Sequence, residues 1–446
     1  MNLRASTALL AAAALIAACT SDETPAPSAT EPTPTPTPET PVDSDPVAGV
    51  DEALLAYYSQ ELVWEPCDDA ECATVEVPLD YAEPEGETIE LALLRSSAVD
   101  DPVGSLLVNP GGPGASGIDY ARQPDNVDDD VRSSFDIVGF DPRGVGSSTP
   151  VDCVDDGELD ELVAAEGAPS DEEELERLQE LHEKFTAGCE ARSGDLLPHV
   201  GTDNVARDLD VLRAVLGDSQ LHYLGKSYGT FIGARYAELF PDRVGRLVLD
   251  GAVDPALSGD EFGLGQAEGI ERALGAYLAW CVEQETCPLG PTEQEAYDTV
   301  DALLTAIGDD PLPTDDEARP LTQPLAVLGI ILPLYLPPEQ GYEVLTAALG
   351  EAQAGNGSVL LMLADAYLQR NDDGTYRNNQ NEVFYAVHCI DRPDSETPTE
   401  IRASLPRFEE ASPIFGPSLA WGSYVCADWP ETERVDQDFS AAGADP

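Results

Sequence analysis

Four short apolar runs, each ending in a glycine-rich turn, constrain the fold of this chain more than any other feature. Strands buried on both faces have apolar runs of this length, and parallel strands need helical connections between them. The pattern therefore predicts an α/β fold with a mostly parallel sheet. The runs and their turns are Gly104–Val108 before 109–114, Phe135–Phe140 before 141–147, Leu221–Leu224 before 225–229, and Arg246–Leu249 before 250–251.

Other segments supply the remaining elements. Residues 72–78 and 88–94 are rich in β-formers and predict two strands ahead of the parallel set. Residues 256–400 contain helical patterns and proline-rich breaks but few strong strands, so we expect a helical insertion there. Apolar residues at helical spacing predict three further helices, over 171–188, 203–216 and 230–240.

The N-terminal residues predict export. Residues 1–18 contain a short positive region, an apolar run too short to span a bilayer, and small residues before Cys19. This resembles the lipobox of bacterial lipoproteins, which implies cleavage after Ala18 and a lipid on Cys19; the alternative is an ordinary cleaved signal peptide. Residues 19–48 are rich in Pro and Thr and predict a disordered linker. We expect membrane attachment through a lipid anchor only, or secretion.

Composition excludes one class of partner. The chain has 22 Lys and Arg against 86 Asp and Glu, a formal charge of −64. Nucleic-acid binding needs clustered basic residues, so no nucleic-acid partner is expected. Hydrophobic residues make up 42% of the chain, which is enough for a large buried core.

The cysteines predict disulfides. Without Cys19, eight of the nine cysteines remain, and an even number in an exported protein favours disulfides. None has the spacing and flanking histidines of a zinc site, so no metal is expected. Proximity in the sequence suggests the pairs Cys67–Cys72, Cys153–Cys189, Cys281–Cys287 and Cys389–Cys426.

The turn Gly225-Lys226-Ser227-Tyr228-Gly229 matches G-x-S-x-G, between a predicted strand and a predicted helix. A nucleophile elbow requires this context, because its glycines allow a tight turn that exposes the serine hydroxyl. The helix N-terminus adds the positive end of a dipole. The alternative is a glycine-rich connection in a parallel sheet. Ser227 is therefore the candidate catalytic nucleophile.

The loop Gly111-Gly112-Pro113-Gly114 follows an upstream predicted strand. Exposed backbone amides there would bind a developing oxyanion, and the amides of Gly112 and Tyr228 are the candidate donor pair. The alternatives are a structural loop or a phosphate cradle. The loop lacks the P-loop spacing, which disfavours nucleotide binding.

The order of these motifs resembles the α/β-hydrolases, specifically the secreted actinobacterial prolyl- and tripeptidyl-aminopeptidases. Further likeness lies in Trp64-Glu-Pro-Cys67, Val77-Pro-Leu-Asp-Tyr81 and Asp208-Leu-Asp210. The resemblance implies that short peptides are cleaved from a free N-terminus through an acyl-enzyme on Ser227, without a cofactor. Carboxylates of the helical insertion, Glu261 and Glu271 among them, are candidates for binding the substrate ammonium group.

The histidine base is harder to place. In this fold the chain order is Ser, then Asp or Glu, then His. His182, His199 and His222 precede Ser227, so we expect them to be structural. His388 alone follows Ser227, which makes it the one candidate base that the order allows. The family stretch that it resembles, however, does not carry the catalytic histidine.

The family's catalytic Asp and His lie on two further strand–loop units, whereas this sequence stops at Pro446. We therefore expect a sheet without its last two strands and with an uncovered hydrophobic edge. Either a truncated enzyme or a product that lost its triad would have this sequence. The expected organisation is a signal peptide (1–18), a linker (19–48), a hydrolase core (49–255), a helical cap (256–400) and a truncated return to the core (401–446).

The function expected from these residues is an exported serine aminopeptidase that acts on short peptides. One alternative is an esterase or lipase of the same fold, because an elbow does not distinguish esters from amides. The other is a catalytically incomplete, peptide-binding lipoprotein, which the unplaced histidine favours.

Overall fold

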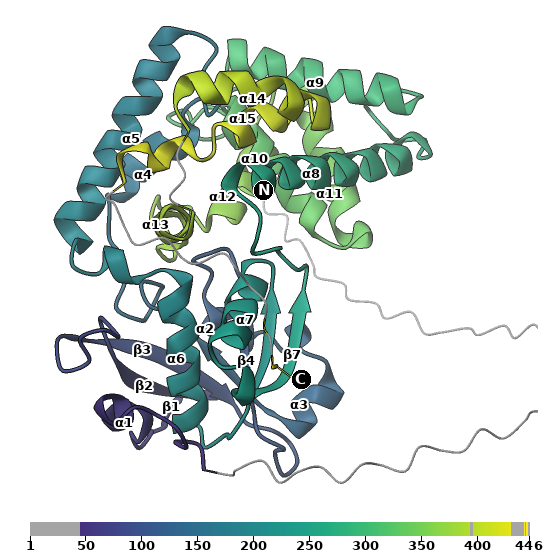
Figure 1. Ribbon diagram of the computed structural model, residues 1–446. Helices are drawn as coiled ribbons and strands as arrows, with labels where there is room; N and C mark the ends of the chain where they lie inside the picture. Colours follow the sequence, from purple (N-terminus) through teal and green to yellow (C-terminus); the bar gives the residue numbers. More distant parts are fainter. Residues whose placement is uncertain (1–44, 393–395, 430–440, 442, 445–446) are drawn as a thin grey trace, which may run out of the picture. The chain divides into compact units, whose positions relative to one another are not determined.

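The computed structural model describes residues 45–392, 396–429, 441, 443 and 444. The predicted signal peptide, Cys19 and most of the linker lie outside these residues. The central feature is one seven-stranded mixed sheet (Figure 1). Its strands are β1 (Glu65–Cys67), β2 (Ala70–Pro78), β3 (Thr88–Ser96), β4 (Ser105–Asn109), β5 (Asp136–Phe140), β6 (Leu221–Lys226) and β7 (Val244–Asp250).

The strand order in the sheet is β1-β2-β3-β5-β4-β6-β7. The first three neighbouring pairs are antiparallel, and the last three, from β5 to β7, are parallel. The register places Val108 beside both Gly139 and Leu224. The carboxyl ends of four parallel strands therefore meet at one edge, which is where ligands bind in open α/β sheets. All six strands expected from the sequence are present, and β1 is an addition.

Helices surround the sheet and form a separate layer beside it. They are η1 (Glu52–Leu54), α1 (Leu55–Tyr58), α2 (Gly117–Arg122), η2 (Pro124–Asn126), α3 (Asp129–Ser134), α4 (Asp156–Ala164), α5 (Glu172–Ser193), η3 (Leu197–His199), α6 (Thr202–Val215), α7 (Tyr228–Leu239), η4 (Pro241–Arg243), α8 (Gly259–Val282), α9 (Glu293–Asp309), α10 (Gln323–Tyr335), α11 (Pro338–Gln353), α12 (Ser358–Leu368), α13 (Gln380–Asp391), α14 (Pro398–Ala411), α15 (Gly416–Ala420) and η5 (Tyr424–Asp428). The three helices expected around 171–240 are α5, α6 and α7.

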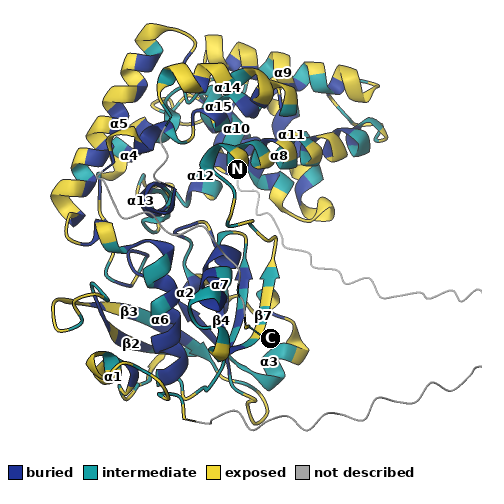
Figure 2. Cartoon of the chain, in the orientation of Figure 1, coloured by how far each residue is buried: buried dark blue, intermediate teal, exposed yellow. Residues whose placement is uncertain are grey.

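The sheet is buried on both faces because its strands are apolar on both. Leu107 and Tyr223 share one core cluster with Leu209 of α6 and Ile232 of α7. On the opposite face, Val108 packs with residues of α2. Figure 2 shows the buried residues concentrated in the sheet and on the inner faces of α6 and α7. This is the arrangement that the glycine-punctuated apolar runs predict.

Most of the predicted insertion forms its own helical cluster. Buried residues of α8 to α12 pack together around Leu274, Ile330 and Leu345. Helices α14 and α15 pack on α8, so residues 398–420 extend the helical region. The sequence predicted a return to the core over 401–446, and within that range Val425, Cys426 and Trp429 belong to the core cluster of the sheet. Helix α13 differs from its neighbours, because Val383 and Ile390 belong to the core cluster of the sheet.

Four disulfides confirm the predicted pairing. They join Cys67 to Cys72, Cys153 to Cys189, Cys281 to Cys287, and Cys389 to Cys426. The last bond ties α13 to η5. Four disulfides fit a protein that folds outside the reducing cytoplasm.

Strand β7 is an edge of the sheet as far as the structure describes it, because it pairs with β6 alone. Exposed residues alternate with partly buried ones along this strand, and Val248 is 55% exposed (Figure 2). The expectation that this edge is left uncovered stays a prediction. Within the described ranges, no helix has the length and apolar character needed to cross a bilayer.

Candidate active site

Ser227 lies between β6 and α7, at the carboxyl edge of the sheet. Its backbone has φ 51° and ψ −123°, a conformation that costs a non-glycine residue on the order of 1–3 kcal/mol. The Ser227 amide donates to the Asp250 carbonyl oxygen at 2.9 Å, which holds the turn against the end of β7. The side chain is exposed at the head of the helix.

The two glycines of the motif are required by close packing. A Cβ on Gly225 would lie 2.4 Å from the Gly229 carbonyl oxygen. A Cβ on Gly229 would lie 2.7 Å from the Asn109 carbonyl oxygen at the end of β4. The turn can therefore be this sharp, and this close to β4, only with glycine at both positions.

The loop after β4 lies against this turn. A Cβ on Gly111 would lie 2.5 Å from the Lys226 carbonyl oxygen and 2.8 Å from the Tyr228 amide nitrogen. The Asn109 side chain accepts the Gly111 amide at 2.9 Å and shapes the loop. Gly111 and Gly112 have φ of 95° and 109°, which favour glycine. The two glycine-rich motifs are thus in direct contact.

Two backbone amides near Ser227 remain available to a ligand. Tyr228 is the first residue of α7, and the first amides of a helix have no acceptor within the helix. The Gly112 amide has no acceptor among the described residues. Amides at the start of a helix, with its dipole behind them, favour negative charge.

The loop after β5 is anchored to α6 by a buried ion pair between Arg143 and Asp208. The Arg143 guanidinium donates twice to Asp208 of α6, both at 2.7 Å, and both side chains are 0% exposed. Its other N–H groups donate to the Pro78, Leu79 and His199 carbonyl oxygens. The pair is therefore fully hydrogen-bonded, which a buried charge pair needs to be tolerated.

Helix α13 is fixed above these loops by polar side chains. Asn379, just before the helix, donates to the Gly144 and Val151 carbonyl oxygens and accepts the Gly146 amide. Glu382 accepts the amides of Cys153 and Val154. Burial raises the pKa of Glu382, and these hydrogen bonds oppose the rise.

The far end of α13 reaches the residue next to Ser227. Asp391 accepts the Tyr228 hydroxyl at 2.9 Å, the Thr202 hydroxyl at 2.5 Å and the Thr202 amide at 2.8 Å. Burial raises the pKa of Asp391 and also that of Tyr228. Sequence reasoning did not assign this cluster. Its signal was an acidic residue on a helix face that otherwise carries apolar side chains.

None of the four histidines contacts Ser227. His388 lies on α13 beside the rings of Phe262 and Phe384, at centroid distances of 6.4 and 6.0 Å. Burial, helped by the nearby Arg392 charge, lowers the pKa of His388 to about 4. In the part of the chain that the structure describes, no side chain hydrogen-bonds to the Ser227 hydroxyl. The role of His388 as a base stays a prediction.

The histidines before Ser227 lie elsewhere. The His222 ring on β6 accepts the Arg246 amide at 3.1 Å. His199 supplies a carbonyl oxygen to Arg143. His182 on α5 is 8% exposed, and burial lowers its pKa to about 4.

A cavity of about 360 Å³, called here the cavity at Gly112, is lined by Gly112 and by residues of the helical region. Helices α4, α5, α10, α12 and α13 contribute its walls, together with residues near α15 and η5. Its volume is in the range of small-molecule sites, which hold roughly 300–1,000 Å³.

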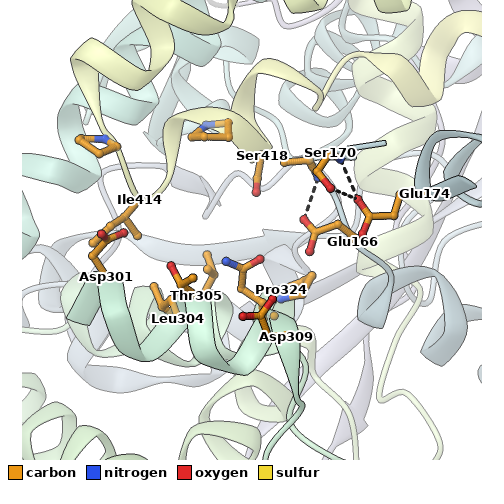
Figure 3. Close-up of a pocket in the computed structure, with 16 residues that line it drawn as sticks. Glu166, Ser170, Glu174, Asp301, Leu304, Thr305, Asp309, Pro324, Ile414 and Ser418 are labelled. Carbon is orange, nitrogen blue, oxygen red and sulfur yellow. Dashed lines mark hydrogen bonds between the residues drawn. The ribbon is translucent and has the colours of Figure 1, made fainter. Parts of the chain in front are cut away.

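A second pocket, also of about 360 Å³, shares Pro324, Val327 and Ser418 with the first. Figure 3 shows carboxylates around it, including Glu166, Glu174, Asp301 and Asp309. Ser170 donates to Glu174 through its amide and its hydroxyl. Burial raises the pKa of Glu166.

The two insertion carboxylates proposed from the sequence have local partners. Glu261 caps α8 through Ser258, and Glu271 accepts the Ser412 hydroxyl at 2.6 Å. Neither residue lines either of the two pockets.

Comparison with known proteins agrees with this geometry. A family model described as the alpha/beta hydrolase fold matches residues 104–336. Serine protease Hip1 of Mycobacterium tuberculosis is 37% identical over 397 residues, covering 83% of this chain and 75% of that protein. The chain belongs to the α/β-hydrolase family. It is a serine hydrolase, and the resemblance stated from its sequence is confirmed.

Two further relatives differ in the activity for which they are named. Carboxylesterase B of M. tuberculosis is 36% identical over 81% of this chain and 70% of that protein. Tripeptidyl aminopeptidase of Streptomyces lividans is 33% identical over 83% of this chain and 71% of that protein. The α/β-hydrolase relatives thus include enzymes named for esters and for peptides.

Proposed function

We propose that this hydrolase is an exported aminopeptidase that releases short peptides from free N-termini through an acyl-enzyme on Ser227. The observation that carries the proposal is the Ser227 turn. An exposed serine at positive φ begins a helix, and the Gly111–Gly112 loop lies against the first helical amide. This is the geometry that a nucleophile elbow requires.

In the proposed reaction, Ser227 Oγ attacks the scissile carbonyl carbon, and the carbonyl oxygen becomes an oxyanion. The amides of Gly112 and Tyr228 donate to that oxyanion, a contribution worth about 10²–10³-fold in rate per donor. The C–N bond then breaks, and the departing amine takes up the proton that the serine released. Water hydrolyses the resulting ester, which frees the peptide and restores Ser227.

Two observations favour peptides with a free amino group. Serine protease and aminopeptidase relatives cover most of the chain. The acid-lined pocket adjoins the cavity at Gly112, so a bound ammonium group would meet a negative potential there. An esterase remains the alternative, because Carboxylesterase B matches almost as well.

One observation favours a second function, peptide binding with little turnover. No histidine contacts Ser227 in the described part of the chain, and a general base contributes about 10²–10⁴-fold to such reactions. An oxyanion site and a binding cleft alone still give a residual rate enhancement.

Labelling with a fluorophosphonate, followed by mass spectrometry of the labelled peptide, tests the nucleophile. We expect the label on Ser227 and none in Ser227→Ala. Hydrolysis of Ala-Ala-Phe-p-nitroanilide is compared with its N-acetyl form and with p-nitrophenyl butyrate. Faster hydrolysis of the free-amine anilide than of its N-acetyl form supports the aminopeptidase. Equal rates for these two anilides, or hydrolysis of the ester with neither anilide cleaved, refutes it. If folded protein is not labelled but binds peptides, the second function replaces the first.

We also propose that Cys19 carries the membrane anchor. The support is the lipobox-like sequence and the proline-rich linker after it. In a bacterial host, the full chain should fractionate with membranes and incorporate labelled palmitate. Cys19→Ser should release it to the soluble fraction; membrane retention of that variant would contradict the lipid anchor.

A further inference from the structure

The cavity at Gly112 differs in chemistry from the rest of the molecule. Charged residues make up 24% of the chain, yet no Asp, Glu, Lys or Arg is among the residues that line this cavity. Its polar lining side chains, such as Gln380 and Asn381, are uncharged. Its apolar walls include Val327, Leu328, Tyr367, Phe384, Tyr385 and Trp421.

The histidine in the cavity wall is also uncharged. His182 lines it, and burial lowers the pKa of His182 to about 4. The ring is therefore uncharged at neutral pH. Its Nδ1 atom has no hydrogen-bond partner among the described residues. A charged ligand group would find no counter-charge in this wall and would lose its hydration, which is unfavourable.

The cavity at Gly112 and the adjoining pocket differ in charge, which assigns a different part of a substrate to each. The pocket in Figure 3 carries carboxylates and suits a cationic group. The cavity at Gly112 carries aromatic and aliphatic side chains and suits an apolar group, because burial of apolar surface is the favourable term. The two spaces share three lining residues and are therefore adjacent, so the proposal assigns one part of a short ligand to each.

The position of the cavity selects which part of the substrate enters it. Gly112, whose amide we propose as an oxyanion donor, is one of its lining residues. A carbonyl oxygen held by that amide belongs to the residue before the scissile bond, so we assign the side chain of that residue to the cavity. In an aminopeptidase the released portion is short, whereas the leaving peptide has any length and must extend into solvent. A bounded cavity therefore suits the released portion.

We infer that this cavity binds a large apolar side chain on the residue immediately before the scissile bond. The inference rests on the proposed function for its orientation. The substrates it selects are peptides with an aromatic or large aliphatic residue at that position and a free amino terminus. Acidic or basic residues at that position are excluded.

Titration calorimetry with the free tripeptides Ala-Ala-Phe, Ala-Ala-Ala and Ala-Ala-Asp tests the inference without turnover. We expect Ala-Ala-Phe to bind about tenfold more tightly than Ala-Ala-Ala, and Ala-Ala-Asp to bind more weakly than either. Leu328→Trp fills the cavity from α10 and should remove the preference for Phe. Met362→Trp, at a 58% exposed site on the neighbouring α12, should retain it.

A second variant keeps the test decisive if Leu328→Trp misfolds. Phe384 is 41% exposed and forms one aromatic wall of the cavity, which Phe384→Ala removes. This variant should bind Ala-Ala-Phe several-fold more weakly and bind Ala-Ala-Ala with unchanged affinity. Equal affinities for the three peptides, or a preference for Phe that survives both cavity variants, overturns the inference. Preference that depends on Leu328, with no label on Ser227, retains the cavity's role and refutes the catalytic proposal instead.

Discussion

The pH dependence of Ser227 labelling identifies the group that takes its proton. The perturbation is a change of pH from 5.5 to 8.5, and the readout is the second-order rate of reaction with a fluorophosphonate. The base could be His388, a histidine with an ordinary pKa, or hydroxide, and each predicts a different dependence of the labelling rate on pH. The structure favours hydroxide. It places no side chain in hydrogen-bonding contact with the Ser227 hydroxyl among the described residues.

The magnitudes follow from the pKa of each base. His388 has its pKa lowered to about 4, so as the base it would be nearly all neutral above pH 5.5, and the rate would change by only about 3%. A histidine with an ordinary pKa of about 6.5 would give a rise of about tenfold and then a plateau. With hydroxide as the base, the rate rises about tenfold per pH unit, about a thousandfold in all.

We expect the hydroxide curve, with the label on Ser227 and no change in His388→Gln. Reagent decay without protein is measured at each pH, and circular dichroism checks that the fold persists over the range. A rate that is flat above pH 5.5 and is lost in His388→Gln would refute the reasoning and make His388 the base. A plateau near pH 7 would assign a histidine in a different arrangement from the one described.

Three further predictions test the framework around the site. Asp208→Ala leaves a buried guanidinium unpaired and should lower the unfolding free energy in urea by about 3–5 kcal/mol, whereas Asp152→Ala, at an exposed ion pair, should cost less than about 1 kcal/mol. Gly111→Ala places a Cβ 2.5 Å from a backbone oxygen and should abolish labelling or folding; Gly265→Ala, where the space is open, should do neither, and normal labelling of Gly111→Ala would contradict the packing. Because the pKa of His388 is lowered when the protein folds, its stabilising contribution is present above pH 6.5 and is lost as the pH falls towards 4, by about 3 kcal/mol. The unfolding free energy of His388→Gln, measured in urea, should therefore fall less steeply over that pH range than that of the parent. Parallel plots of unfolding free energy against pH for the two proteins would refute the lowered pKa of His388.

The sheet and the Ser227 turn could be predicted because their signals are local. Apolar runs followed by glycines specify buried strands and tight turns within a few residues of each other. Gly225 and Gly229 are required because the backbone packs too closely there for a side chain. A sharp turn between a strand and a helix already implies such close packing. Two of the disulfides are equally local, with separations of 5 and 6 residues, whereas the other two join neighbouring cysteines 36 and 37 residues apart. The three-residue β1 was missed, because so short a strand has no periodicity to detect.

The role of α13 could not be predicted, because its partners are distant in the sequence. Glu382 bonds to Cys153, 229 residues away, and Asp391 bonds to Thr202, 189 residues away. From the sequence both residues are ordinary acids in an acid-rich chain. A more specific signal was present: Glu382 lies four residues before Ala386, so it occupies a face that is otherwise buried. The structure therefore assigns to the core a helix that the sequence assigned to the cap.

Helix α13 joins the two halves of the proposed site in one rigid element. Phe384 and Tyr385 line the cavity, while Val383 packs under the Gly111–Gly114 loop, 3.1 Å from where a Gly114 Cβ would lie. About two turns along the helix from Val383, Asp391 accepts a hydrogen bond from the hydroxyl of Tyr228, the residue that follows Ser227. The wall that contacts an apolar side chain is thus fixed to the loops that carry the candidate oxyanion donors. Because α13 positions both the cavity wall and these loops, the binding energy of the substrate side chain helps to hold the scissile carbonyl in place. Remote contacts raise reactivity in this way. This positioning by α13 does not depend on which group takes the serine proton, because α13 acts on the side-chain wall and on the loops of the candidate oxyanion donors.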